Sequence, residues 1–152
     1  MTKKERIERR LANKTKRQER KKLRKEKFDE LMTKVKDTPG FPDDGSTPDY
    51  AQKFKTYWPV VKAALVFAES TKITRPKMDL QIQRIILLGD GMADNPVFDP
   101  DSEFIIKIRK AWRIMRTILI TITAFITNDK NDDKIDKLIE IGDWISGLDG
   151  ND

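Results

Sequence analysis

The chain of 152 residues contains no cysteine and no histidine. Without cysteine, it can form no disulfide, no zinc–thiolate site and no thiol nucleophile. Without histidine, it lacks the commonest metal ligand and the general base of Ser-His and Cys-His pairs. The lack of cysteine also fits a reducing compartment.

Catalytic and metal-binding motifs are missing as well. The Gly89-Asp90-Gly91 turn is too short for a glycine-rich phosphate loop. Residues 129–140 place acidic residues as a calcium loop does, but Lys134 stands where that loop requires glycine. Helix capping is the better interpretation of those acids. We therefore expect a protein that is not an enzyme and that uses no cofactor and no metal.

No apolar run in the sequence is long enough to cross a membrane. The longest candidate, IMRTILITITAFIT at 114–127, contains Arg116 and is shorter than the ~20 apolar residues that a span needs. The start, MTKKERIERR, has no apolar stretch behind its basic residues, so it does not resemble a signal peptide. We expect a location in the cytoplasm or within a virion, with no secretion and no membrane partner.

Charge is distributed unevenly along the chain. Residues 1–27 hold 14 Lys or Arg and 4 Glu, a net charge of +10. Residues 28–152 hold 17 Lys or Arg and 21 Asp or Glu, a net charge of −4. A basic N-terminal arm is thus attached to a mildly acidic body, and such asymmetry indicates an anionic partner for the arm.

The arm has the composition of a helix that no core buries. It contains no proline or glycine and is rich in good helix formers. Its few large apolar residues, Ile7, Leu11 and Leu23, make no continuous face. Apolar residues at i, i+3, i+4 and i+7 then follow, namely Phe28, Leu31, Met32 and Val35. This amphipathic stripe predicts that the end of the arm docks onto the body.

The rest of the sequence carries one pattern twice. The first copy contains YWPVVK at 57–62 and IQRIILLGD at 82–90, and the second contains AWRIMR at 111–116 and IDKLIEIGD at 135–143. A glycine inside a helix costs ~1 kcal/mol, so each glycine indicates a close approach between helices. One helical hairpin cannot bury its apolar face, whereas two stacked copies can. The alternative is a chance likeness between amphipathic helices.

Capping residues predict where the helices of each copy begin. Thr47-Pro48-Asp49 and Asp99-Pro100-Asp101 combine a cap, a proline at the first helical position and an acid in the first turn. In the same way Asp79 predicts the start of the second helix of the first copy. Asp132 or Asp133 predicts the corresponding start in the second copy.

Two segments are ambiguous within this scheme. Pro59 is expected to kink or break the first long helix near Trp58. The β-branched run TILITIT at 117–123 suits a strand as well as a helix. The matching segment VVKAALVFAES at 60–70 favours a helix. The predicted core collects residues of both copies: Trp58, Leu65, Ile82, Ile86, Trp112, Leu119, Ile122, Leu138 and Ile139.

The repeated pattern, Trp-Pro-x-Val-Lys followed by Ile-x-x-Ile-Ile-x-x-Gly-Asp, resembles small uncharacterised helical proteins of tailed bacteriophages and their hosts. In the second copy Arg113 replaces the proline. The resemblance implies a phage or mobile-element context, and no family function is carried over with it.

These features predict an all-α fold: a basic N-terminal helix followed by two repeated helical hairpins packed as a four-helix core around a pseudo-two-fold axis. The expected segments are a basic helical arm at 1–36, a linker at 37–47, a first hairpin at 48–92, a connector at 93–99 and a second hairpin at 100–148.

The expected function is that of a non-enzymatic interaction or assembly protein, phage-related or virion-associated, whose arm contacts nucleic acid or an acidic protein surface. The alternative is a small cytosolic nucleic-acid-binding or regulatory protein, and a third possibility is an arm that only solvates the chain. The arm has no aromatic residue for base stacking, and Asn13 and Gln18 stand alone as base readers. A homo- or hetero-oligomer fits the assembly role.

Two groups of cations are the candidate contact residues. The first group rings the arm and comprises Lys3, Lys4, Arg6, Arg9, Arg10, Lys14, Lys16, Arg17, Arg20, Lys21, Lys22, Arg24, Lys25 and Lys27. The second group lies at i, i+4 and i+7 of the second copy and comprises Arg109, Arg113 and Arg116, next to Lys110. A solvated helix face is the competing interpretation of the second group.

Overall fold

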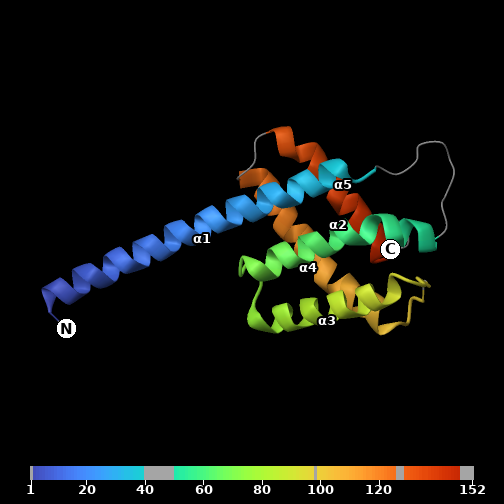
Figure 1. The fold of residues 1–152 in the computed structure, drawn as a ribbon, viewed down its shortest axis with the longest axis horizontal. Coiled ribbons are helices and arrows are strands. Elements are labelled where there is room, and N and C mark those ends of the chain that lie inside the picture. Colours follow the sequence, from blue (N-terminus) through green and yellow to red (C-terminus); the bar gives the residue numbers. More distant parts are fainter. Residues whose placement is uncertain (1, 40–49, 98, 126–128, 148–152) are drawn as a thin grey trace.

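The computed structural model describes the backbone of residues 2–39, 50–97, 99–125 and 129–147, and the side chains of the same residues except 122–130. Over these residues the chain forms five α-helices and no β-strand (Figure 1). The all-α prediction is therefore confirmed. The helices are α1 Lys3–Asp37, α2 Tyr50–Ser70, α3 Pro76–Met92, α4 Glu103–Phe125 and α5 Asp129–Ile145.

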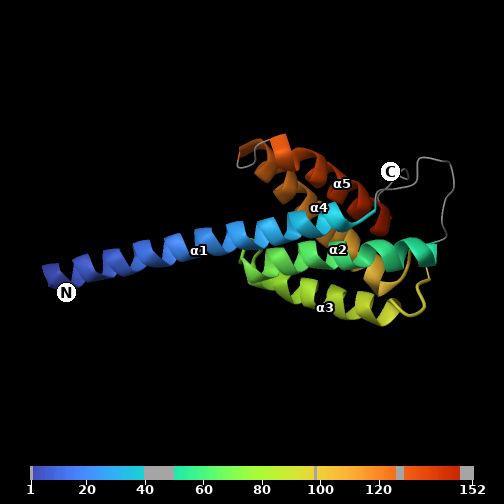
Figure 2. The same cartoon turned by 45° about the horizontal axis from the view of Figure 1, so that its top comes forward.

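Helix α1 is one continuous helix of 35 residues. It begins with a capping box, in which the Thr2 hydroxyl accepts from the Glu5 N–H at 3.2 Å and the Glu5 carboxylate accepts from the Thr2 N–H at 3.3 Å. Its buried residues are confined to the C-terminal part and are Phe28, Leu31, Met32 and Val35. The predicted docking stripe is thus confirmed, and the N-terminal part of α1 projects away from the body (Figures 1 and 2).

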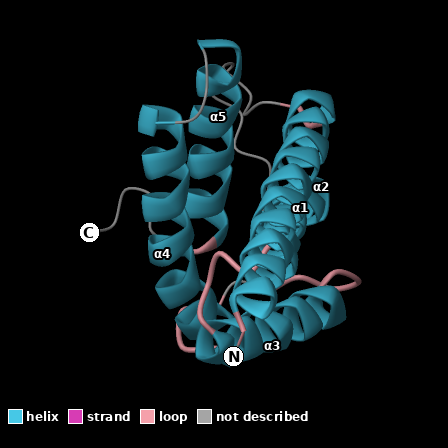
Figure 3. Ribbon diagram, turned by 90° about the vertical axis from the view of Figure 1, so that its left-hand side faces the viewer, coloured by secondary structure: helices cyan, strands magenta, loops and turns pink. Residues whose placement is uncertain are grey.

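Helices α2 to α5 form the body beneath the C-terminal part of α1. Sequential helices contact each other within the pairs α2–α3 and α4–α5, and the two pairs meet through α2–α5 and α3–α4. Helix α1 rests on α2 and α5. In Figure 3, which looks along α1 from its N-terminal end, α4 and α5 stand side by side and α3 closes the base.

The core is built largely from the predicted residues. Six of them are buried: Trp58, Leu65, Ile82, Trp112, Leu119 and Leu138. Ile86 and Ile139 are only half-buried against the same core, and the side chain of Ile122 lies outside the described residues. The prediction omitted Phe104, which is buried in α4. The ring of Phe104 makes edge contacts with Phe54 at 5.8 Å and with Trp58 at 5.4 Å, so it ties α4 to α2.

Pro59 does not break α2. The helix runs without interruption from Tyr50 to Ser70, and Pro59 lies on its exposed side. At that side water can replace the backbone hydrogen bond that proline cannot form. The TILITIT run is likewise helical, because α4 continues through Phe125.

Three predicted helix starts are wrong by a few residues. Helix α3 begins at Pro76, which has the fixed φ of a first helical residue, and Asp79 lies inside its first turn. There Asp79 accepts a hydrogen bond from the Thr74 hydroxyl. Helix α5 begins at Asp129, so Asp132 and Asp133 are helical residues rather than caps.

The start of α4 also differs from the prediction. Helix α4 begins at Glu103, after the Asp99-Pro100-Asp101 sequence. Asp99 instead closes a turn by accepting from the Asp101 N–H at 3.0 Å, and the Ser102 hydroxyl accepts from the Ile105 N–H at 3.3 Å. The proposed start at Thr47-Pro48-Asp49 lies outside the described residues.

Candidate anion-binding surface

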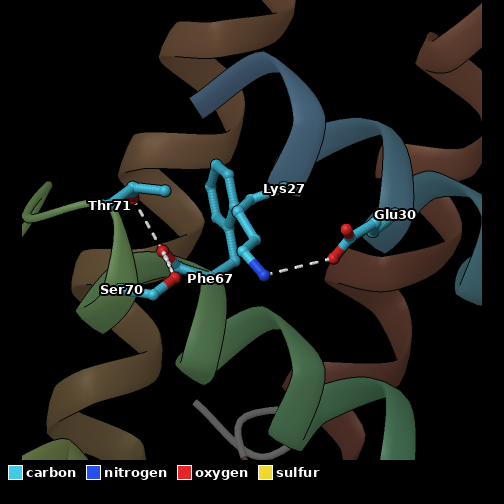
Figure 4. Close-up of polar contacts among 5 residues, drawn as sticks. All are labelled: Lys27, Glu30, Phe67, Ser70 and Thr71. Carbon is cyan, nitrogen blue, oxygen red and sulfur yellow. Dashed lines mark hydrogen bonds and ion pairs between the residues drawn. The ribbon is translucent and has the colours of Figure 1, made fainter. Parts of the chain in front are cut away.

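The arm is fixed to the body at its base. Arg24 Nε donates to the Thr71 carbonyl at 3.4 Å, at the C-terminal end of α2 where helix carbonyls attract a cation. Figure 4 shows Lys27 and Glu30 of α1 beside Phe67, and their charged groups lie 3.5 Å apart. The ring of Phe28 packs against that of Phe67 at 6.1 Å. Arg24 therefore serves as an anchor and Lys27 pairs with Glu30 within α1, although both cations were predicted as anion contacts.

At this junction the hydroxyl groups at the end of α2 form hydrogen bonds with the backbone of the same helix. Thr71 Oγ1 and Ser70 Oγ both donate to the Phe67 carbonyl, at 2.6 and 3.3 Å (Figure 4). The Thr71 side chain is buried, and its own carbonyl remains the acceptor that Arg24 reaches. The junction is thus a packed and hydrogen-bonded support for the projecting helix.

Beyond this support α1 is exposed on all sides. Every side chain from 2 to 26 is exposed, including Ile7, Leu11 and Leu23. Residues 3–23 form a rod of about 31 Å at 1.5 Å per residue. The rod carries 11 of the predicted contact cations, and Lys25 lies just beyond it: Lys3, Lys4, Arg6, Arg9, Arg10, Lys14, Lys16, Arg17, Arg20, Lys21 and Lys22.

These cations do not surround the helix evenly. At about 100° per residue, six of them fall within a sector of about 80° and form what we call the basic stripe. Its members are Lys3, Arg6, Arg10, Lys14, Arg17 and Lys21. The four glutamates of residues 1–27, Glu5, Glu8, Glu19 and Glu26, gather on the opposite side of the helix. One face of the rod is therefore free of acidic residues.

The second predicted group of cations is largely used inside the body. Arg109 is half-buried, and its Nε donates to the Ser146 carbonyl at 2.9 Å, where α5 ends. Arg116 lies 3.5 Å from the Asp143 carboxylate. Arg113 and Lys110 are exposed on α4. The structure thus places Arg109 and Arg116 in contacts that hold α4 to α5.

A further basic group, missed in the sequence, lies in the turn between α2 and α3 and at the start of α3. Lys72, Arg75 and Lys77 are all exposed. They lie close together in the segment TKITRPK, and that density of cations was a usable signal. Thr71 precedes them directly, so its contact with Arg24 places the turn beside the base of the arm. Figures 1 and 2 both show this turn next to the point where α1 leaves the body.

Two tryptophan contacts set the spacing of helices inside the body. Trp58 Nε1 donates to Asp90 Oδ1 at 3.0 Å, and Trp112 Nε1 donates to Asp143 Oδ1 at 3.0 Å. A Cβ atom placed on Gly89 would lie 2.1 Å from the Trp58 ring, and one on Gly142 would lie 1.8 Å from the Trp112 ring. The predicted close approach is therefore that of an indole ring.

In each of these contacts, the cation four residues after the tryptophan pairs with the same aspartate. Lys62 Nζ lies 2.8 Å from Asp90, as Arg116 lies 3.5 Å from Asp143. The hydrogen bond from Lys62, and then that from Trp58, hold the pKa of the Asp90 carboxyl below its usual value. We call each set of tryptophan, glycine, aspartate and cation a tryptophan clasp.

The residues that the structure describes show neither a metal site nor a membrane-spanning helix. Among these residues no three acidic side chains gather as a metal site would require. Within the same residues, none of the helices combines the length and apolarity that a membrane span needs. In comparisons with known proteins, no family model, curated protein or solved structure matches the chain.

Proposed function

We propose that the protein is a non-enzymatic binding protein that contacts an anionic partner through the N-terminal part of α1. The observation that carries this proposal is the basic stripe on a projecting rod. A helix with no apolar face gains no stability from packing, so its ordering needs another partner. The acid-free face supplies the attraction for an anionic one.

Nucleic acid and an acidic protein surface are the two classes of partner that this charge favours. A nucleic acid fits the number of cations, because it carries a regular series of phosphates. The alternative role is that of a small cytosolic nucleic-acid-binding or regulatory protein. The virion-associated role implied by the resemblance to phage proteins stays a prediction.

We also propose that the body is a duplicated helical hairpin, α2–α3 and α4–α5, that presents the arm. The two tryptophan clasps support this, because each joins the first helix of its pair to the second. Tryptophan and aspartate are 32 residues apart in one clasp and 31 in the other. Superposition of residues 48–92 on 100–145 in an experimental structure, with Trp58 over Trp112, tests the duplication.

Removal of residues 2–23 tests the role of the arm. The truncation keeps Arg24 and the docking stripe, so the body should retain the helical circular dichroism of α2 to α5. The full chain should bind random duplex DNA or single-stranded RNA in low salt, and the truncated chain should lose most of that affinity. Equal, weak binding by both chains, without self-association of the full chain, would contradict the proposed function.

A further inference from the structure

We infer that the basic stripe and the α2–α3 turn are two walls of one surface that holds duplex DNA by its phosphate backbone, with little sequence preference. We call this surface the basic corner. The inference rests on the proposed function and specifies both the partner and the residues that meet it.

The geometry of α1 places the turn on the side that the stripe faces. The stripe residues recur every three or four positions, and the same spacing continues through Arg24 into the buried residues Phe28 and Leu31. The stripe and the docked side of α1 are therefore one face of the helix. Arg24 meets the Thr71 carbonyl on that face, and Lys72 follows directly. Figures 1 and 2 show the resulting angle between the arm and the body.

Lys72 stands at a position where a side chain is costly. Its φ of 58° lies in the left-handed region, and the Ile73 N–H bonds back to the Ala68 carbonyl at 3.2 Å, as in a glycine-capped helix end. Glycine is the usual residue there because it has no Cβ to strain the backbone. A lysine at this position gives the corner an exposed cation at the expense of backbone strain.

The arm fits a duplex better than a single strand. Single strands are held by bases stacked on aromatic side chains, and residues 1–27 contain no aromatic residue. The major groove of B-form DNA, about 12 Å wide, admits an α-helix, whereas the deep, narrow major groove of duplex RNA does not. Cations that flank the stripe would face the two phosphate strands, and these are Arg9 and Arg20 on one side and Lys25 on the other.

An acidic surface on a second copy of the chain is a poorer match. On the body, among the side chains that the structure describes, the longest row of acids outside the tryptophan clasps lies along α5 and comprises Asp132, Asp133, Asp136 and Glu140. From the first to the last of these the row spans about 12 Å, whereas the stripe spans about 27 Å from Lys3 to Lys21. A continuous polyanion is therefore needed to pair with the whole stripe.

Paired substitutions with a matched control test the corner. Arg10→Gln with Arg17→Gln removes two cations from the centre of the stripe, whereas Lys4→Gln with Lys22→Gln removes two from the glutamate side of the same helix. In salt titrations against random duplex DNA, the first pair should reduce the log–log slope by about 1.8, since each phosphate contact contributes about 0.9. The control pair should leave the slope nearly unchanged.

A third variant tests the second wall. Lys72→Gly with Arg75→Gln should also lower the slope and the affinity for duplex DNA. Because glycine relieves the strained backbone at position 72, the melting temperature should stay the same or rise, which separates lost binding from lost folding.

Each other outcome overturns a distinct part of the inference. Equal losses of affinity in the stripe pair and the control pair would show a diffuse electrostatic attraction. That result would rule out a specific binding face on α1 but not an anion-binding arm. An unchanged slope in the third variant would remove the second wall. Tighter binding to duplex RNA or single-stranded DNA would exclude the duplex DNA assignment. Self-association of a chain that binds no DNA would identify a second copy as the partner.

Discussion

Single residues decide how closely the helices of the body approach. In each tryptophan clasp the indole ring occupies the space that a Cβ atom would need at the glycine position. The indole N–H donates to the aspartate that follows this glycine. A mid-helix glycine costs ~1 kcal/mol relative to alanine. Burial of a whole tryptophan side chain against the neighbouring helix more than offsets that cost.

Gly89→Ala should destabilise the protein by about 1–3 kcal/mol, because its Cβ would overlap the Trp58 ring and Asp90 holds that ring in place. Gly91→Ala is the matched control, since it lies in the same helix with no atom within 4 Å of the new Cβ. The control should be neutral or stabilising by up to ~1 kcal/mol. Urea unfolding of both variants measures the difference. Equal stability of the two would rule out the tight ring contact.

Asp90 predicts a pH dependence on the acid side. Its pKa in the folded protein lies below the usual value of 3.8 because Lys62 and Trp58 favour the ionised carboxylate. The stabilisation is therefore present above the unfolded pKa and is lost as pH falls through the lower folded pKa. Asp90→Asn should be less stable than the parent at neutral pH, and this difference should shrink below pH 3.8.

Thermal unfolding across that pH range checks the Asp90 prediction. Asp94→Asn is a suitable control, because Asp94 is exposed just beyond the end of α3. A difference between Asp90→Asn and the parent that stayed constant with pH would show that the carboxylate charge is irrelevant.

At the scale of helices, cations from other elements complete three helix ends. Arg24 donates to the Thr71 carbonyl just after α2, and Arg109 donates to the Ser146 carbonyl just after α5. Lys137 Nζ donates to the Val35 carbonyl at 3.0 Å and to that of Thr38, at the end of α1. Unsatisfied carbonyls and the helix dipole both favour a cation there, so these contacts fix how the helices dock.

Contacts of this kind, between helices, could not be predicted from the sequence. Apolar spacing predicted that the helices exist and that docking begins at Phe28, because periodicity depends only on neighbouring residues. It did not predict that Arg109 and Arg116 would contact the C-terminal end of α5, because their partners Ser146 and Asp143 lie far from them in the sequence. Asp79 is a local case, because its carboxylate accepts a hydrogen bond from the Thr74 hydroxyl just before α3 instead of capping the helix.

Amide hydrogen exchange should divide α1 into two parts. Amides near 28–35 lie in the buried, docked segment and should be protected nearly to the global stability. Amides of residues 3–23 have no packing to hold their hydrogen bonds and should exchange much faster, since an isolated helix of this length is marginal. Addition of duplex DNA should slow exchange in 3–23 and leave 28–35 unchanged. Uniform protection along α1 would mean that the rod is packed in solution.

At the scale of the whole molecule, arm and body differ in charge and in the source of their stability. The first 27 residues carry a net charge of +10 and the remainder −4. The body is held by a shared core in which Phe104 of α4 contacts Phe54 and Trp58 of α2. Because this aromatic cluster joins the two helix pairs, they should lose their structure together, whereas the projecting rod shares none of those contacts.

Urea unfolding followed by two signals should therefore give different curves. Tryptophan fluorescence reports only the body, because Trp58, Trp112 and Trp144 all lie there, and it should show one cooperative transition. Far-ultraviolet circular dichroism also reports the rod, whose helix should melt gradually at lower urea. Deletion of residues 2–23 should remove the gradual phase and make the two curves coincide. If the fluorescence of the truncated chain still showed two transitions, the helix pairs would be independent units and the shared core would not couple them.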